Sequence, residues 1–255
     1  MATVPLLADF AVRLVFGLIV ALTLTSWRAV PPRFFRIQAQ IALGILVLAA
    51  LSQATSVGAS FGLWLLIAGT GATYLATVSW GLGLPSVATV LDMLVLIATG
   101  GWIVVASRDP DPAAWGWMAA SRADSGLLLG ATLHSMLLGH YYLSAPAMSI
   151  SPLTRSLDLI VAALVARCLL AGIGAFVLHH GVAAPAKAGQ AGELVILVMR
   201  WGMGVIGAGV SVFLARRTAA IRSTQSATGI LYITTIFVLF GELASLPMAS
   251  RGQFE

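Results

Sequence analysis

Long apolar runs, separated by short polar breaks, follow one another along the whole sequence. A run of about 18–25 apolar residues is the length that an α-helix needs to cross the hydrocarbon core of a bilayer. The runs predict spans at residues 6–27, 36–54, 61–80, 85–106, 124–145, 155–178, 192–214 and 227–247. We therefore expect an all-α, polytopic integral membrane bundle of about eight transmembrane helices, in one domain covering residues 1–255. Six or seven spans follow instead if the second or third run is re-entrant.

The composition supports a bilayer as the solvent of this chain. Hydrophobic residues make up 59% of the sequence and charged residues only 9%, whereas soluble domains carry roughly 25% charged residues. All the cations except Lys187 are arginines, and most of them lie between the apolar runs. This distribution indicates topology and lipid-headgroup contacts, and we expect no nucleic-acid partner. The single Cys168 lies within an apolar run, which argues against disulfides and thiolate metal cages.

The basic residues between the runs predict an orientation. Cytoplasmic loops carry an excess of Lys and Arg, and the two sides of the predicted bundle differ in this respect. One side carries Arg28, Arg33, Arg36, Arg155, Arg216, Arg217 and Arg222, and the other carries Arg108, Arg122, Lys187 and Arg251. The asymmetry predicts a multi-pass protein of the plasma or inner membrane with both termini outside. Arg216, Arg217 and Arg222 are also candidates for binding anionic lipid headgroups.

Tryptophans mark the expected membrane boundaries. Most lie near predicted span ends, namely Trp27, Trp64, Trp80, Trp102, Trp115 and Trp117. This placement is typical of the aromatic belt at the headgroup level. Trp115 and Trp117 further predict that residues 112–122 form an interfacial segment on the outer surface. We expect residues 108–122 and the outer loop at 179–192 to serve as docking surfaces for a partner subunit.

Ionisable side chains inside the spans are the candidates for chemistry, because each costs at least about 2.5–3.5 kcal/mol at the bilayer centre on insertion scales. Candidates for quinone or proton handling are His134, Arg167, His140, Tyr141, Asp158 and Asp92. Candidates for an intramembrane ion-pair column are Glu193, Arg200 and Glu242. Arg13 lies close enough to a span end to extend its guanidinium to the membrane surface. The first three helices then carry almost no buried charge, and we expect them to be scaffold.

His134 and Arg167 form the most specific predicted pair. The fifth and sixth helices are expected to be antiparallel, and both residues lie roughly 15 Å deep when counted from the outer span ends. Gly126, Gly130 and His134 recur every four residues, a small-residue stripe that favours close helix packing. No acid is predicted at their level, and Asp92 is the nearest candidate partner. The competing interpretation is structural, with buried polar pairs serving only to fix helix register.

Known cofactor patterns are mostly excluded. A haem with two histidine ligands needs a second deep histidine on a facing helix, so we do not expect this chain alone to bind haem. A retinal Schiff base needs a lysine within a helix, whereas Lys187 is predicted in a loop. No metal-binding motif is present, and we expect no metal site. A quinone pocket asks only for an apolar slot, a hydrogen-bond donor and a titratable group.

We therefore predict an integral membrane subunit of a larger respiratory or photosynthetic electron-transfer complex. It would act as a scaffold, with other protein subunits and membrane lipid as partners, and would provide a quinone or proton-handling site. The predicted bundle is similar to quinol-reactive membrane anchor subunits in helix number, and in no motif. The alternative is a transporter of a small solute or ion, and a weaker alternative is a membrane enzyme that acts on lipid with His140 as its base. The residues leave open whether the chain is itself an enzyme.

Overall fold

The computed structural model describes residues 5–145, 147–180 and 198–250, and within these ranges the chain consists of helices joined by short turns and loops and has no strand. The elements are α1 (Leu6–Leu24), α2 (Pro32–Ser56), α3 (Phe61–Gly81), α4 (Pro85–Ala106), α5 (Pro112–Ser144), α6 (Ser151–His180), η1 (Met199–Gly207), α8 (Ala208–Ala220) and α9 (Thr224–Ser250). The π-helix η1 continues directly into α8, because Ala208 keeps helical dihedral angles. The described ranges thus form eight helices, and the predicted all-α class is confirmed.

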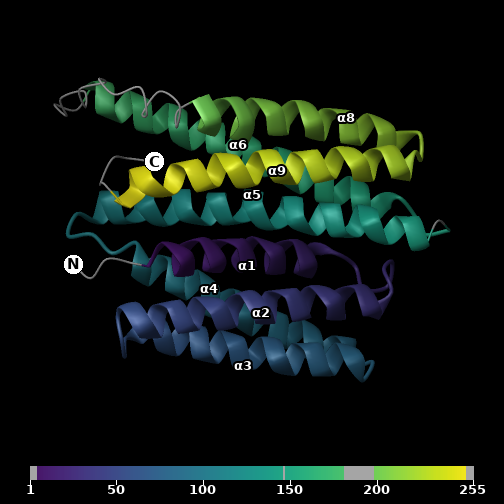
Figure 1. Ribbon diagram of the computed structural model, residues 1–255, viewed down its shortest axis with the longest axis horizontal. Helices are drawn as coiled ribbons and strands as arrows, with labels where there is room; N and C mark the ends of the chain where they lie inside the picture. The colour runs from purple at the N-terminus through teal and green to yellow at the C-terminus, as the bar shows by residue number, and fades with distance from the viewer. Residues whose placement is uncertain (1–4, 146, 181–197, 251–255) are drawn as a thin grey trace.

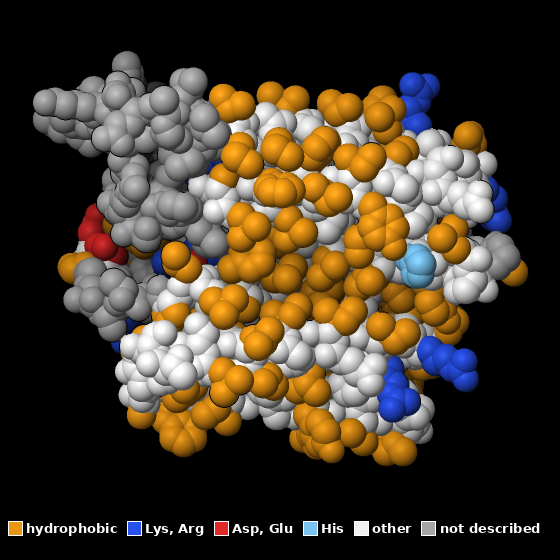
Figure 2. Space-filling view, in the orientation of Figure 1, with side chains coloured by type: hydrophobic (Ala, Val, Ile, Leu, Met, Phe, Trp, Pro, Cys, Tyr) orange, Lys and Arg blue, Asp and Glu red, His pale blue; other side chains and the backbone are white. Residues whose placement is uncertain are grey.

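The helices lie side by side along one axis, and successive helices run in opposite directions (Figure 1). The start of α1 and the end of α9 lie at the same end of the bundle. Six helices of the described ranges are long and apolar enough to cross a membrane, namely α1, α2, α3, α4, α6 and α9. The more polar α5 lies lengthwise beside α1 and α9. Figure 2 shows hydrophobic side chains covering the face between the two ends, so the molecule is a multi-pass helical membrane bundle.

The second and third spans, the least certain from sequence, are both full-length helices. α2 has 25 residues and α3 has 21, and both pass the length and hydropathy criteria for a span. Proline begins α2, α4 and α5, at the position where its missing N–H costs no hydrogen bond. Ser60 caps α3 by accepting a hydrogen bond from the Leu63 N–H at 3.2 Å.

α5 differs most from its prediction, because it begins at Pro112 rather than at residue 124. Residues 112–122 are the first turns of this helix and not a segment outside it. Their place at the membrane interface and their role as a docking surface stay predictions. The other predicted docking surface, the loop at 179–192, lies outside the described residues from residue 181 on. The Trp115 indole N–H donates to the Val104 carbonyl at 2.8 Å, and the Trp117 ring packs on Gly174 of α6. The two tryptophans therefore fasten the start of α5 to its neighbours.

The small-residue stripe of α5 packs against α1 at backbone contact. A Cβ at Gly130 would overlap the backbone of Gly17 and Leu18, and one at Gly126 would lie 2.6 Å from the Arg13 carbonyl oxygen. Because α1 and α5 run in the same direction (Figure 1), this contact continues along both helices to His134. The predicted stripe is confirmed.

Two tryptophans predicted in the aromatic belt lie in the core instead. Trp80 is 3% exposed and Trp102 is 1% exposed. The Trp80 ring stacks on Phe35 at a centroid distance of 4.5 Å, and its indole N–H donates to Asp92. Trp27 and Trp64 are exposed, as a belt requires.

Candidate functional site

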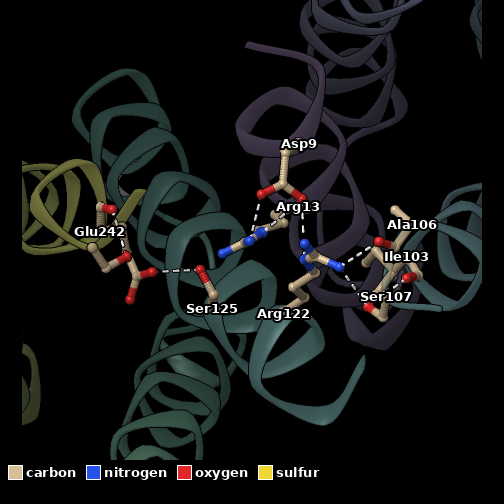
Figure 3. Close-up of polar contacts among 9 residues, drawn as sticks. Asp9, Arg13, Ile103, Ala106, Ser107, Arg122, Ser125 and Glu242 are labelled. Carbon is tan, nitrogen blue, oxygen red and sulfur yellow. Dashed lines mark hydrogen bonds and ion pairs between the residues drawn. The ribbon is translucent and has the colours of Figure 1, made fainter. Parts of the chain in front are cut away.

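A first cluster of buried charge joins α1, α4 and α5. Asp9 binds Arg13 on its own helix, and the Arg122 Nε lies 3.5 Å from Asp9 Oδ1. Arg122 also donates to the Ala106 carbonyl at 2.7 Å and to the Ser107 hydroxyl at 2.9 Å. Figure 3 shows the Arg122 guanidinium between Asp9 and the end of α4.

Arg13 corrects two predictions from the sequence. Its side chain is 1% exposed, so it does not extend to the membrane surface. Since Asp9 and Arg13 are four residues apart, they face each other on one helix turn and enter the bundle as a pair. The expectation of a first helix without buried charge is therefore wrong as well.

A second cluster, which we call the acid pair, consists of Asp124 on α5 and Glu242 on α9 with Arg167 of α6 between them. The Arg167 Nε lies 2.7 Å from Asp124 Oδ2, and its Nη2 lies 2.7 Å from Glu242 Oε1. Ser125 donates its hydroxyl hydrogen to Glu242 Oε2 (Figure 3). All three charged side chains are less than 10% exposed. Asp124 Oδ1 is buried and has no hydrogen-bond partner.

The predicted pairing of His134 with Arg167 is wrong. Arg167 lies at the level of Asp124, and ten residues of α5, about 15 Å of helix, separate Asp124 from His134. The depth count placed the outer end of the span at residue 124, whereas α5 begins at Pro112. The prediction that no acid lies beside Arg167 fails for the same reason.

His134 has its own polar environment at the other end of α1. Its Nε2 lies 2.9 Å from the Thr25 hydroxyl, and its Nδ1 lies 2.8 Å from Gln38 Oε1. The imidazole is fully buried and meets the edge of Phe34 at a centroid distance of 5.5 Å. Both ring nitrogens are therefore hydrogen-bonded, one to α2 and one to the segment that follows α1.

Asp92, the predicted partner of the histidine, lies in a different contact. Its Oδ2 accepts a hydrogen bond from the Trp80 indole at 3.1 Å, and its side chain is buried. The remaining oxygen, Oδ1, has no hydrogen-bond partner. The contacts of Asp92 are thus with α3, and its proposed role in proton handling stays a prediction.

The remaining candidates for quinone or proton handling, His140, Tyr141 and Asp158, lie in three separate contacts. His140 Nδ1 lies 3.4 Å from the Tyr232 hydroxyl, and Tyr141 packs on Phe34. Asp158 forms an ion pair of 2.7 Å with Arg216, and both side chains are about half exposed. These residues each have a contact, but the contacts do not form one site.

Part of the predicted Glu193–Arg200–Glu242 column lies outside the described residues, because Glu193 does. Arg200 is half-buried in η1. η1 touches α9 directly beside the acid pair, since a Cβ at Gly241 would contact Gly204 and approach the Arg200 carbonyl oxygen at 3.5 Å. Glu242 contacts Arg167 and Ser125.

The sequence prediction missed the roles of Asp9, Arg122, Asp124 and Ser125 in these clusters, and also the π-helix. The signal for Asp9 was its spacing of four from Arg13. The signal for Asp124 is its place at the edge of an apolar run, where a charge equally fits a membrane boundary. The closely spaced Gly202, Gly204 and Gly207 lower the preference for a regular α-helix and are the only sequence sign of η1.

Within the described ranges, no three His, Cys, Asp or Glu side chains gather closely enough to hold a metal ion. No protein-family model, curated protein or solved structure matches the chain.

Proposed function

We propose that the protein is an integral membrane subunit that takes up and releases protons at the acid pair, within a larger electron-transfer assembly. The observation that carries the proposal is the carboxylate of Asp124, which lies inside the bundle with one oxygen bound to Arg167 and the other without a hydrogen-bond partner. An ionisable group at such a position is a functional candidate by default.

The arrangement of charges around Arg167 supports proton binding. Two carboxyl groups contact the same guanidinium, each at 2.7 Å. A buried carboxylate oxygen without a hydrogen bond is costly, and a proton or a water molecule removes that cost. Ser125 adds a hydroxyl to Glu242, and a hydroxyl both donates and accepts hydrogen bonds. The cluster thus has the parts of a proton relay between α5 and α9.

The neighbouring π-helix also supports a functional site. η1 spans nine residues and packs on Gly241, the residue before Glu242. π-helical segments are rare and occur frequently at functional sites. Irregular backbone at membrane depth is tolerated where it lies within protein or lines a cavity. An adjustable turn beside Glu242 fits a site that changes its protonation.

The electron-transfer part of the proposal concerns partners. The described loops between helices hold no folded domain of their own, so the proposal assigns redox cofactors to partner subunits. A quinone would be the mobile substrate at the lipid boundary, because its reduction takes up protons. The role in electron transfer is tested separately from proton binding at the acid pair.

Infrared spectroscopy of the purified protein tests the proton-handling site. We expect a carboxyl C=O band at the frequency of an acid that water does not reach, and we expect its intensity to change with pH. Glu242→Gln and Asp124→Asn should each remove or shift this band, whereas Asp158→Asn, at an exposed acid on α6, should leave it unchanged. Size-exclusion profiles show whether each variant is folded. A folded wild type that gives no such band at any pH contradicts the proposal.

Purification of the tagged protein from its native membrane in mild detergent tests the assembly. We expect stoichiometric partner subunits with a haem, flavin or iron–sulfur absorption, and quinone in the organic extract. In the intact assembly, Glu242→Gln should slow proton-coupled turnover at least tenfold relative to Asp158→Asn. A monodisperse, colourless and lone protein would exclude the electron-transfer role.

Ion or solute transport is the second candidate, and η1 is the observation that favours it. Transporters place interrupted helices at their substrate sites near the membrane midplane, and η1 brings Arg200 to the neighbourhood of the acid pair. Liposomes that contain the lone protein and a pH-sensitive dye separate the two functions. A proton or solute flux without partners, absent in Glu242→Gln, would favour transport.

A further inference from the structure

An apolar groove lies between α6 and α8 near the end of the bundle where α8 finishes. Its volume is about 750 Å³, within the range of pockets that hold small organic ligands. Val165 and Leu169 of α6 form one wall, and Phe213 of α8 lies on the other. All three side chains are more than half exposed, so the groove opens outward from the bundle.

Two arginines close one end of this groove. Arg216 and Arg217 are both among its lining residues. Arg217 holds its guanidinium 5.7 Å from the centre of the Phe213 ring, and Arg216 pairs with Asp158 at 2.7 Å. Arg155 and Arg222 lie near the same ends of α6 and α8 and are exposed. Figure 2 shows basic side chains at this end of the bundle.

The charges at this end are unbalanced. The described residues at these ends of α6 and α8 include one acid, Asp158, and four arginines, namely Arg155, Arg216, Arg217 and Arg222. Arginine is well suited to phosphate, because its guanidinium offers a planar fork of donors. The mouth of the groove is therefore cationic, while its walls are apolar.

We propose that the groove binds one anionic phospholipid, with its acyl chains along Val165, Leu169 and Phe213 and its phosphate at Arg216 and Arg217. A zwitterionic lipid offers the same chains and a phosphate, but its choline or ethanolamine group adds a positive charge at a mouth that is already cationic. A basic residue near a membrane surface contributes about fivefold in affinity for acidic lipid. The proposal does not depend on the chemistry of the acid pair.

Native mass spectrometry of the purified full chain, titrated with phosphatidylglycerol or phosphatidylcholine, tests the headgroup preference. We expect at least about tenfold tighter binding of phosphatidylglycerol. The double variant Arg216→Gln/Arg217→Gln should lose this preference. The matched control, Arg28→Gln/Arg33→Gln, removes two exposed arginines at the same end of the bundle and should keep it. Equal binding of the two lipids by the wild type overturns the proposal.

A second variant tests the groove without touching the arginines. A Cβ at Gly209, a lining residue, meets nothing within 4 Å, so the position has room for the start of a side chain, and Gly209→Phe adds a ring to the groove. We expect it to release the bound phosphatidylglycerol, whereas Gly71→Phe, at an equally open site on α3, should not. Retention of the lipid by Gly209→Phe overturns the proposal. A wild type that forms a dimer, together with a Gly209→Phe variant that is monomeric, also overturns the proposal. The groove would then hold a second copy of the chain and not a lipid.

Discussion

The α1–α5 pair and the α6–α8 pair contain the same residue types, glycine and arginine, in very different surroundings. On α1 and α5, Gly17, Gly126 and Gly130 bring the two backbones into contact. Between α6 and α8, Gly209 faces open space and lines a groove. Small residues thus permit a close approach, but the opposite helix decides whether it occurs.

The arginines of the two pairs differ in the same way. Arg13 is 1% exposed and binds Asp9 one turn before it, inside the bundle. The side chain of Arg216 is 47% exposed, and its partner Asp158 is 54% exposed. A guanidinium is buried where carboxylates and carbonyls from several helices surround it, and otherwise remains at the surface.

The largest expected effect comes from breaking the closed pair at Gly130. Gly130→Leu places side-chain atoms where the α1 backbone lies, so α1 and α5 have to separate. Overpacking of a well-packed core costs about 1–3 kcal/mol and occasionally more, and a backbone obstacle puts this variant above that range. We expect little or no monodisperse protein after extraction in detergent.

The matched change in the open pair is Gly209→Leu. It should leave the yield and the melting temperature unchanged or slightly raised, since leucine favours a helix over glycine by roughly 0.5–1 kcal/mol. Size-exclusion profiles after heating compare the two variants. Equal behaviour of Gly130→Leu and Gly209→Leu would mean that the α1–α5 contact does not hold the bundle together.

The second effect compares a buried with an exposed ion pair. Arg167→Gln leaves Asp124 and Glu242 without their shared guanidinium, and removal of one partner of a buried pair costs about 3–5 kcal/mol. Arg216→Gln should cost at most about 1 kcal/mol, because water screens the exposed pair. Thermal unfolding in detergent measures both losses.

A double variant shows whether the stability lost in Arg167→Gln comes from the broken ion pair or only from the smaller side chain. Arg167→Gln combined with Glu242→Gln removes a positive and a negative charge together, and part of the lost stability should return. If the double variant is no more stable than the single one, the Arg167–Glu242 contact does not determine the stability of the cluster.

The sequence predicted the bundle well because hydropathy and helix length are local properties. The run at 85–106 coincides with α4, and the Pro and Ser residues at the breaks mark true helix starts. The start of α5 was predicted wrongly, since Arg122 and Asp124 interrupt its apolar run. They lie inside the helix because Asp9 and Arg167, far away in sequence, bind them.

The site was predicted less well, because it depends on which helices are neighbours. The polar residues within apolar runs were recognised as candidates, and Arg167 and Glu242 are indeed buried. Their partners followed from helix order and relative height, which no local pattern contains. One error at the start of α5 was enough to place His134, rather than Asp124, beside Arg167.

The smallest effect sharpens the assignment of His134, at the far end of the α1–α5 contact. His134→Leu leaves Gln38 Oε1 without its partner, whereas Thr25 keeps its bond to the Ala21 carbonyl. A single orphaned buried group costs about 1–3 kcal/mol, and replacing both partners by apolar groups can be nearly neutral. We therefore expect His134→Leu/Gln38→Leu to be more stable than His134→Leu in thermal unfolding.

Because about 15 Å of helix separates His134 from Asp124, His134→Leu should also leave the infrared carboxyl band of the acid pair unchanged. Loss of that band would show that the histidine and the acid pair act as one site after all.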